Sequence, residues 1–151
     1  MFVGIIIPRK INNSIYLNIY EEFIRRINSY TNLNCCDFKP KYRENTSKEL
    51  DYIGNKMISI AKDGYKVAFD AEGYMMDTIS FSNWLEDKLM GEKKLYFIIG
   101  GSFGIPKKVK SHSNEVLSFS KLTFSHEIAL VILLEQIYRA FTIINGHPYN
   151  K

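Results

Sequence analysis

Cysteine is scarce in this sequence, and its two copies, Cys35 and Cys36, are neighbours. Adjacent cysteines are poorly placed to bridge each other with ordinary disulfide geometry, so the pair fits a protein of a reducing compartment. Histidine is also sparse: His112, His126 and His147 lie too far apart for a local ligand motif, and no further cysteine completes a Cys-x-x-Cys site. We therefore expect no bound metal.

Long hydrophobic runs are missing as well. The longest late run, residues 128–134, has seven residues, whereas a membrane-spanning helix needs roughly 20. Residues 1–8 are too short for the apolar core of a signal peptide and have no basic region before them. We expect no membrane span and a cytoplasmic location, while an organellar location stays open because a targeting segment could have been removed.

The composition is that of a folded protein with a modest positive charge. Its 151 residues are 46% hydrophobic and 14% aromatic, enough for one domain with its own core. The net charge of +4 suits a polyanionic partner. The alternative is a compositional bias, since lysine, asparagine, isoleucine and tyrosine are all abundant.

Short apolar runs alternate with segments of helical periodicity along the whole chain. The expected strands are residues 2–7, 33–38, 65–69, 95–99 and 115–118, and the expected helices are 15–30, 46–60, 78–90, a short basic one from Pro106, and 126–145. This alternation predicts an α/β fold, a mostly parallel sheet flanked by helices.

Individual residues should define the helix ends and inner faces. Thr46 and Glu49 have the spacing of a capping box, Ser125 should cap the last helix, and Gly146 should end it. The expected inner faces are Ile15, Ile19, Phe23, Ile27 and Tyr30 in the first helix, and Ile79, Leu85 and Leu89 in the third. The last helix is apolar almost all round, so we expect part of it to pack against a second subunit.

A glycine pair marks the candidate site. Gly100 and Gly101 stop the apolar run 96–99, as expected where a buried strand ends at a turn whose backbone closely approaches a ligand. A polar turn, residues 70–73, should lie at the same edge of the sheet. The alternative for the glycine pair is an ordinary turn from strand to loop. Residues 118–125, rich in hydroxyl groups, are expected to form a loop.

Four linked segments then resemble one family. Residues 97–104, 117–126, 135–140 and 147–149, in this order and spacing, are similar to the RlmH-type methyltransferases of large-subunit ribosomal RNA, members of the SPOUT class. Residues 68–73 resemble the family's short Leu-Asp-x-x-Gly turn. The chain departs from the family pattern at Leu130, where an arginine is usual, at Asn150, where a histidine is usual, and at Ser125.

The resemblance implies a fold, an activity and partners. We expect a single SPOUT methyltransferase domain over residues 1–151, with a trefoil knot in its cofactor-binding part, about residues 95–151. A homodimer is implied, with S-adenosylmethionine as cofactor and N3 of a pseudouridine in large-subunit ribosomal RNA as methyl acceptor. The departures leave two alternatives: a SPOUT methyltransferase with another RNA substrate, or a catalytically inactive RNA-binding dimer.

The resemblance also implies the cofactor-binding residues. They are Phe69, Gly100, Gly101, Phe119, Ser120, Lys121, Leu122, Thr123 and Phe124. Glycines would let the backbone reach the cofactor without a Cβ clash, and exposed loop amides would hydrogen-bond the adenine edge. For the apolar residues of the loop, core packing is the alternative.

The candidate catalytic residues are His126, Arg139, His147, Tyr149 and Glu135. The acceptor nitrogen carries a proton at neutral pH, so a base or a group that stabilises the imide anion should help. Glu135 is four residues before Arg139 and can orient it, with a surface or intersubunit ion pair as the alternative. His126 has helix capping or packing as its alternative. The expected contacts to RNA phosphates are Lys107, Lys108, Lys110 and Arg139. Lys39, Lys41 and Arg43 are weaker candidates for such contacts.

Overall fold

The computed structural model describes residues 1–42 and 46–151, so the predicted phosphate contact Arg43 lies outside the described residues. Strands and helices alternate along these residues. In chain order they are β1 (Phe2–Ile7), α1 (Ser14–Ile27), β2 (Asn32–Asp37), α2 (Thr46–Ile60), β3 (Tyr65–Met75), α3 (Thr78–Gly91), β4 (Lys94–Ile99), α4 (Lys107–His112), β5 (Glu115–Ser118) and α5 (His126–Ile144). Each strand and helix expected from the sequence is present.

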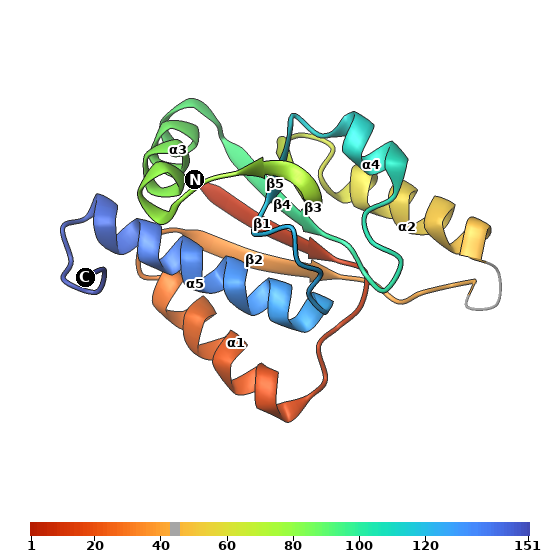
Figure 1. Ribbon diagram of the computed structural model, residues 1–151, viewed down its shortest axis with the longest axis horizontal. Helices are drawn as coiled ribbons and strands as arrows, with labels where there is room; N and C mark the ends of the chain where they lie inside the picture. The colour runs from red at the N-terminus through yellow and green to blue at the C-terminus, as the bar shows by residue number, and fades with distance from the viewer. Residues whose placement is uncertain (43–45) are drawn as a thin grey trace.

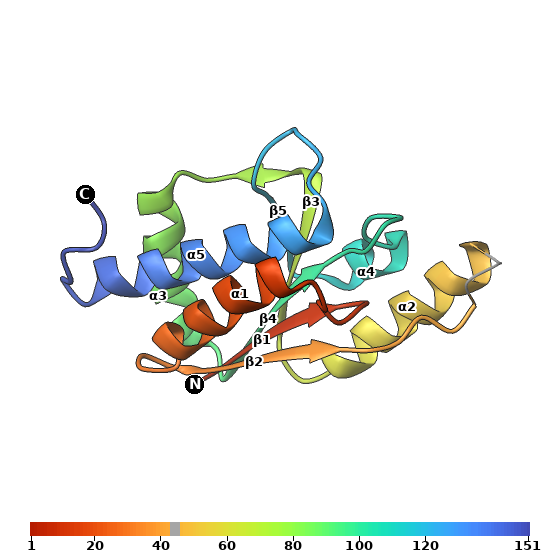
Figure 2. The same cartoon turned by 90° about the horizontal axis from the view of Figure 1, so that it is seen from below.

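All neighbouring strands of the sheet run parallel, in the order β2-β1-β4-β3-β5. In the centre of the sheet, Ile5 of β1 is in register with Cys35 of β2 on one side and Phe97 of β4 on the other. The arrows of β1 and β2 point the same way in Figure 2. The carboxyl ends of the strands therefore meet at one edge, which confirms the predicted parallel α/β fold.

Helices cover both faces of the sheet (Figure 1), and successive residues of the central strands pack on opposite faces. In β4, Phe97 packs on the face that carries α1, α3 and α5, while its neighbour Ile98 packs on the face that carries α2 and α4. This alternation follows from the two-residue period of a strand. It also explains why the sequences of β1 and β4 are continuous apolar runs.

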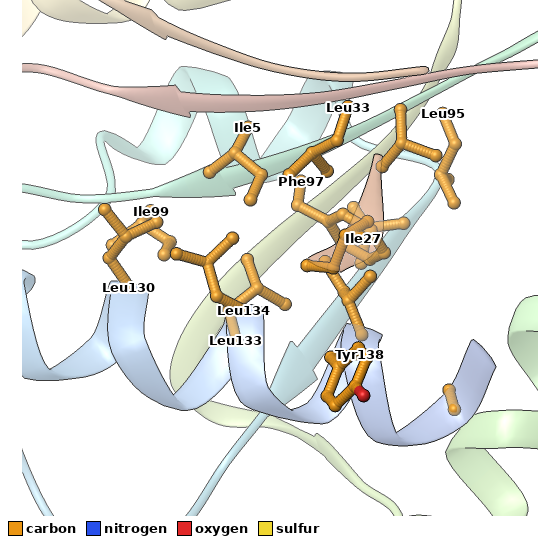
Figure 3. Close-up of a cluster of buried hydrophobic side chains, with 14 of the residues drawn as sticks. Ile5, Ile27, Leu33, Leu95, Phe97, Ile99, Leu130, Leu133, Leu134 and Tyr138 are labelled. Carbon is orange, nitrogen blue, oxygen red and sulfur yellow. The ribbon is translucent and has the colours of Figure 1, made fainter. Parts of the chain in front are cut away.

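Helix α5 packs on one face of the sheet together with α1 and α3. Leu130, Leu133 and Leu134 are completely buried and point at Ile5, Phe97 and Ile99 of the sheet in Figure 3. Full burial of a leucine contributes about 1.5–3 kcal/mol, so this helix is a large part of the core. Most of its apolar residues are thus covered within one chain, so the apolar character of α5 does not by itself require a second subunit, and the dimer stays a prediction. Ile128 is 40% exposed.

Two expected inner faces are wrong in part. Phe23, Ile27 and Tyr30, and Leu85 and Leu89 of α3, pack in the core as expected, whereas Ile15, Ile19 and Ile79 do not. In α1, Ile15 and Ile19 are 70% and 41% exposed, while Tyr16 and Tyr20, one residue further on, pack against the core together with Phe23. Both candidate stripes share Phe23 and Ile27, and the stripe with two tyrosine rings buries more area.

The expected inner face of α3 also includes a residue that is exposed. Ile79 is 51% exposed, whereas Phe81 and Leu85 are buried. The Asp77 carboxylate, which accepts a hydrogen bond from the Ser80 amide at 2.7 Å, caps the helix. The cap fixes where the helix begins, and Ile79 falls within its first, exposed turn.

The predicted capping box of α2 is also wrong. Thr46 is the first residue of the helix rather than its cap. The Glu49 carboxylate is buried and accepts hydrogen bonds from the backbone amides of Lys41 and Tyr42. Glu49 therefore connects α2 to the segment that follows β2.

Strand β3 does not end at Phe69 as expected. It continues to Met75, and both Phe69 and Tyr74 are in register with Leu117 of β5, so the residues between them bulge out of the strand. The polar turn at residues 70–73 is this bulge, in which the Asp70 carboxylate accepts from the Glu72 amide at 2.9 Å. A Cβ at Gly73 would lie 2.4 Å from the Leu117 carbonyl carbon, so the bulge requires glycine there.

Candidate cofactor site

A cavity of about 540 Å³ opens at the carboxyl edge of the sheet. Four chain segments line it: the start of the β3 bulge, the loop after β4, the loop after β5, and the first turn of α5. The residues are Phe69, Asp70, Ala71, Ile99, Gly100, Gly101, Ser102, Gly104, Ile105, Ser118, Phe119, Ser120, Leu122, Thr123, Phe124, Ser125, His126 and Ala129. The two loops singled out in the sequence thus face one cavity.

The glycine loop is folded back on itself. The Gly104 amide donates to the Gly101 carbonyl at 3.0 Å, and Gly104 has a φ of +75°. A Cβ at Gly100 would lie 2.4 Å from the Gly104 carbonyl carbon and 2.6 Å from the Ile105 nitrogen. The closure of the loop therefore requires glycine at position 100, whether or not a ligand is bound.

The opposite wall is the loop between β5 and α5. The Ser118 hydroxyl donates to the Ser120 carbonyl at 2.8 Å, and the Ser120 hydroxyl accepts from the Leu122 amide at 3.1 Å. Phe119 stacks on Phe69 of β3, with ring centroids 4.2 Å apart. These contacts give the loop a defined shape, and its hydroxyl groups serve its own backbone.

Most predicted cofactor residues line the cavity, with one exception. Phe69, Gly100, Gly101, Phe119, Ser120, Leu122, Thr123 and Phe124 all do so, whereas the exposed Lys121 does not. The Leu122 side chain is 70% exposed, so it lies at the rim rather than in the core.

Asp70 lines the cavity although it was not expected from the sequence to belong to the site. Its carboxylate pairs with the Lys110 ammonium of α4 at 3.3 Å. The resemblance of residues 68–73 to a family turn was the available signal. Lys110 is thereby placed beside the cavity rather than fully in solvent.

His126 begins α5 and lines the cavity. Its Nε2 lies 3.2 Å from the Glu127 carboxylate, and its side chain is 15% exposed. The Ser125 hydroxyl, which accepts from the Ile128 amide at 3.4 Å, caps the helix as predicted. The cap is therefore Ser125 and not His126, whose imidazole is left at the cavity wall.

The other candidate catalytic residues form a separate cluster. Glu135 accepts hydrogen bonds from Arg139 at 2.6 and 2.9 Å and from the Tyr149 hydroxyl at 3.4 Å. The hydrogen bonds that Arg139 donates to Glu135 raise the pKa of Arg139. Arg139 also donates to Asn150 at 3.0 Å. The predicted orientation of Arg139 by Glu135 is confirmed as a contact.

This Arg139 cluster lies far from the cavity along α5. Arg139 follows His126 by 13 residues, which corresponds to about 20 Å along a helix. His147 lies in the tail beside the cluster, where its amide donates to the Thr142 carbonyl at 2.8 Å. One chain therefore brings His126 to the cavity and leaves Arg139, His147, Tyr149 and Glu135 elsewhere.

Comparison with known proteins gives the family. A family model described as "Predicted SPOUT methyltransferase" matches residues 1–150. The chain belongs to the SPOUT methyltransferase family. Two curated relatives, both called "Ribosomal RNA large subunit methyltransferase H", come from Malacoplasma penetrans and Clostridium botulinum (strain Okra). They are 36% and 37% identical to this SPOUT chain, and each match covers the whole of both sequences.

Solved structures agree in fold. A probable methylase family protein from Haemophilus influenzae has a TM-score of 0.60 at 11% identity and covers 99% of this chain and 70% of its own. A probable methyltransferase from Bordetella pertussis has a TM-score of 0.56 at 11% identity and covers 92% of this chain and 93% of its own. At this identity the likeness supports the α/β architecture of the SPOUT chain. The trefoil knot stays a prediction.

Neither a membrane-spanning helix nor a cluster of metal ligands occurs in the described part of the chain. Within residues 1–42 and 46–151, no helix is long and apolar enough to cross a membrane. The same residues contain no group of three or more histidine, cysteine or acidic side chains arranged to hold a metal ion.

Proposed function

We propose that this SPOUT methyltransferase transfers a methyl group from S-adenosylmethionine to N3 of a pseudouridine in large-subunit ribosomal RNA. The observation that carries the proposal is the cavity that the glycine loop and the loop before α5 line together. The relatives named as large-subunit methyltransferases support the choice of RNA. A protein acting on ribosomes would work in the cytoplasm.

The residues present fit the proposed cofactor. The cavity volume of about 540 Å³ falls within the roughly 300–1,000 Å³ typical of small-molecule sites. Phe69, Phe119 and Phe124 would hold the apolar parts, and the backbone of residues 119–124 would meet the adenine edge. Lys121 would contribute only its backbone. When bound, the cofactor supplies a methyl group already activated on a sulfonium, so the protein needs no metal for this step.

The remaining work of the protein is alignment and proton removal. The N3–H bond of the acceptor breaks, the N3–methyl bond forms as the sulfur–methyl bond breaks, and one proton is released. We assign the uptake of that proton to the His126 imidazole, because it lines the cofactor cavity. Loops that hold both reactants in line would supply much of the rate, since productive orientation replaces a chance encounter.

We propose a homodimer in which a second copy completes the site. Arg139 is about 20 Å along α5 from His126, too far to touch the same base, and His147 and Tyr149 follow the end of this helix. Two copies with antiparallel α5 helices would bring the Arg139 end of one to the His126 end of the other. The exposed Ile128, with the half-buried Val131 and Ile132, would supply apolar contacts for such a pairing.

Ribosomal RNA from cells with and without the gene tests the acceptor. We expect mass spectrometry to find N3-methylated pseudouridine in the large subunit only when the gene is present, and a plasmid copy to restore it. A plasmid copy that encodes the His126→Ala variant should not restore the modification. An unchanged modification in cells that lack the gene would contradict the proposed acceptor.

Titration of the protein with S-adenosylmethionine by calorimetry tests the inactive alternative. Binding at micromolar concentration agrees with the enzyme, and no binding at millimolar concentration favours an RNA-binding protein without turnover. The other alternative, a different RNA, rests on Leu130 and Asn150. Leu130 is completely buried in the core, so the missing arginine at this position removes nothing from an exposed surface of this chain.

A further inference from the structure

A second cavity, of about 250 Å³, lies beside the proposed cofactor cavity. Three residues, Gly101, Ser102 and His126, line both cavities. The second cavity is completed by residues from the loop after β1, the segment after β2, and α2: Pro8, Arg9, Pro40, Glu49 and Ile53, together with Phe103. The glycine loop therefore separates two neighbouring cavities, and His126 belongs to both.

The walls of this second cavity suit a flat, partly polar ring. Pro8, Pro40 and Ile53 provide apolar surface, and Phe103 is 59% exposed at the tip of the glycine loop. An exposed aromatic ring of this kind is the usual stacking partner for an unpaired nucleobase.

The charged groups of the second cavity differ in their availability. The Glu49 carboxylate is bound to the backbone amides of Lys41 and Tyr42, and His126 lies beside Glu127. Arg9 is exposed, and within the described part of the chain its guanidinium forms no ion pair or hydrogen bond. Arg9 is thus the cation that this cavity offers to a ligand.

We propose that the second cavity receives the base to be methylated, after the base has flipped out of the RNA. The proposal rests on the proposed function and names the place of its acceptor. A base stacked on Phe103 would have its ring beside His126, next to the cofactor cavity. The Arg9 guanidinium would donate to an imide oxygen adjacent to N3 and stabilise the negative charge that appears when N3 loses its proton.

The surroundings of the second cavity suit RNA. Lys39 and Lys41 flank Pro40 and are exposed, and the Lys41 ammonium lies over the Tyr42 ring, so both place positive charge near the phosphates next to a flipped nucleotide. Enzymes that modify a base take it out of the stack and read it in a pocket, at the cost of unstacking it. A small apolar cavity with one free guanidinium and a cationic rim has the features that this mode of binding needs.

The test compares methyl transfer with cofactor binding in four variants. Arg9→Ala and Phe103→Ala change the second cavity, while Lys93→Ala and Met90→Ala are matched controls on exposed residues outside both cavities. Ribosomes purified from cells without the gene are the methyl acceptor, and calorimetry with S-adenosylmethionine measures cofactor affinity. We expect both cavity variants to lose about 10- to 100-fold in kcat/KM, the range of one stacking or charged contact. Their cofactor affinity should stay within about twofold of the parent.

Each outcome has a distinct meaning. Loss of transfer with retained cofactor affinity, and unchanged controls, supports the base cavity. Arg9→Lys should recover part of the loss, since it restores the charge without the forked geometry. If Arg9→Ala and Phe103→Ala methylate like the parent, the base cavity is wrong and the proposed function stands. If the parent binds the cofactor but methylates no ribosomal RNA, the proposed function is wrong, and the base cavity falls with it.

Discussion

Phe69 and Phe119 lie stacked, with their ring planes inclined at only 10° and their centroids 4.2 Å apart. The pair connects β3 to the loop between β5 and α5, and both rings line the candidate cofactor cavity. Stacked aromatic pairs contribute about 0.5–1.5 kcal/mol beyond the area they bury. The stack is therefore a contact on which the shape of the loop depends.

Replacing Phe119 by alanine should weaken cofactor binding by about tenfold, since roughly 1.4 kcal/mol of loop stabilisation is lost. Calorimetric titration with S-adenosylmethionine measures the change. Phe119→Leu keeps apolar contact without stacking and should lie between the alanine variant and the parent. Equal affinity of all three proteins would show that the stack does not support the site.

Gly100→Ala should disrupt the glycine loop, because the added Cβ would lie 2.4 Å from the Gly104 carbonyl carbon. We expect a lower melting temperature and a cofactor affinity reduced more than about tenfold. Gly91→Ala is the matched control, since a Cβ there meets nothing within 4 Å. Gly91 ends a helix, so alanine there should leave stability unchanged or raise it slightly. Thermal melts and cofactor titrations of both variants check the prediction.

The central strands were predictable because both of their faces are buried. Residues 95–99 are apolar without interruption, and a parallel strand covered by helices on both faces needs that pattern. The end of α5 was also predictable from the sequence. Gly146 has a φ of +65°, a backbone conformation that favours glycine. In both cases the structural requirement acts on consecutive residues, so the sequence alone reveals it.

The predictions from the sequence were wrong where contacts between segments far apart in the chain determine the structure. Ile15 and Tyr16 lie on neighbouring candidate stripes, and only the packing of α1 on the sheet and α5 selects the tyrosine. Residues 70–73 resemble a turn, yet pairing with β5 continues the strand to Met75. The second cavity is the strongest case: Arg9, Glu49 and Phe103 come from three separate segments. No local pattern indicates that these residues meet.

A polar cluster at the opposite edge of the sheet predicts how stability depends on pH. Burial alone would raise the pKa of the Glu115 carboxyl, but hydrogen bonds from Tyr65, Lys88 and Trp84 outweigh it and hold the pKa below its ordinary value of 4.5. The ionised carboxylate therefore stabilises the fold above about pH 4.5. This contribution is lost as the pH falls toward the pKa of the folded state.

Glu115→Gln removes that charge. We expect a melting temperature lower by roughly 2–4 °C at pH 7, for about 1 kcal/mol lost. The difference from the parent should shrink as the pH falls below 4.5, where the parent protonates. Thermal melts between pH 3 and pH 7 measure it. Glu86→Gln is the control, on the same helix as Lys88. A difference that stays constant with pH would contradict the assignment to charge.

The separation of His126 and Arg139 predicts a complementation pattern. His126→Ala and Arg139→Ala homodimers should each lose most methyl transfer, by about 100-fold or more if each residue acts on the reaction. If two copies share a site, mixing both variants gives dimers with one intact site, and activity returns. If each chain forms its own site, the mixed dimers stay inactive.

Co-expression of the two variants with different tags, followed by purification through both tags, gives the mixed dimer for assay. Light scattering on the untagged parent checks the dimer itself. A monomer of 17.6 kDa would remove the basis of this prediction.

The position of α5 after all five strands has a consequence for folding during synthesis. The face that carries α2 and α4 can pack once those elements have been made, whereas the opposite face has α1 and α3 but lacks α5 until the chain is nearly complete. A growing chain therefore exposes part of one apolar face of its sheet to chaperones and to aggregation. Because the loop before α5 forms a wall of the cofactor cavity, the ligand can stabilise only a nearly finished molecule.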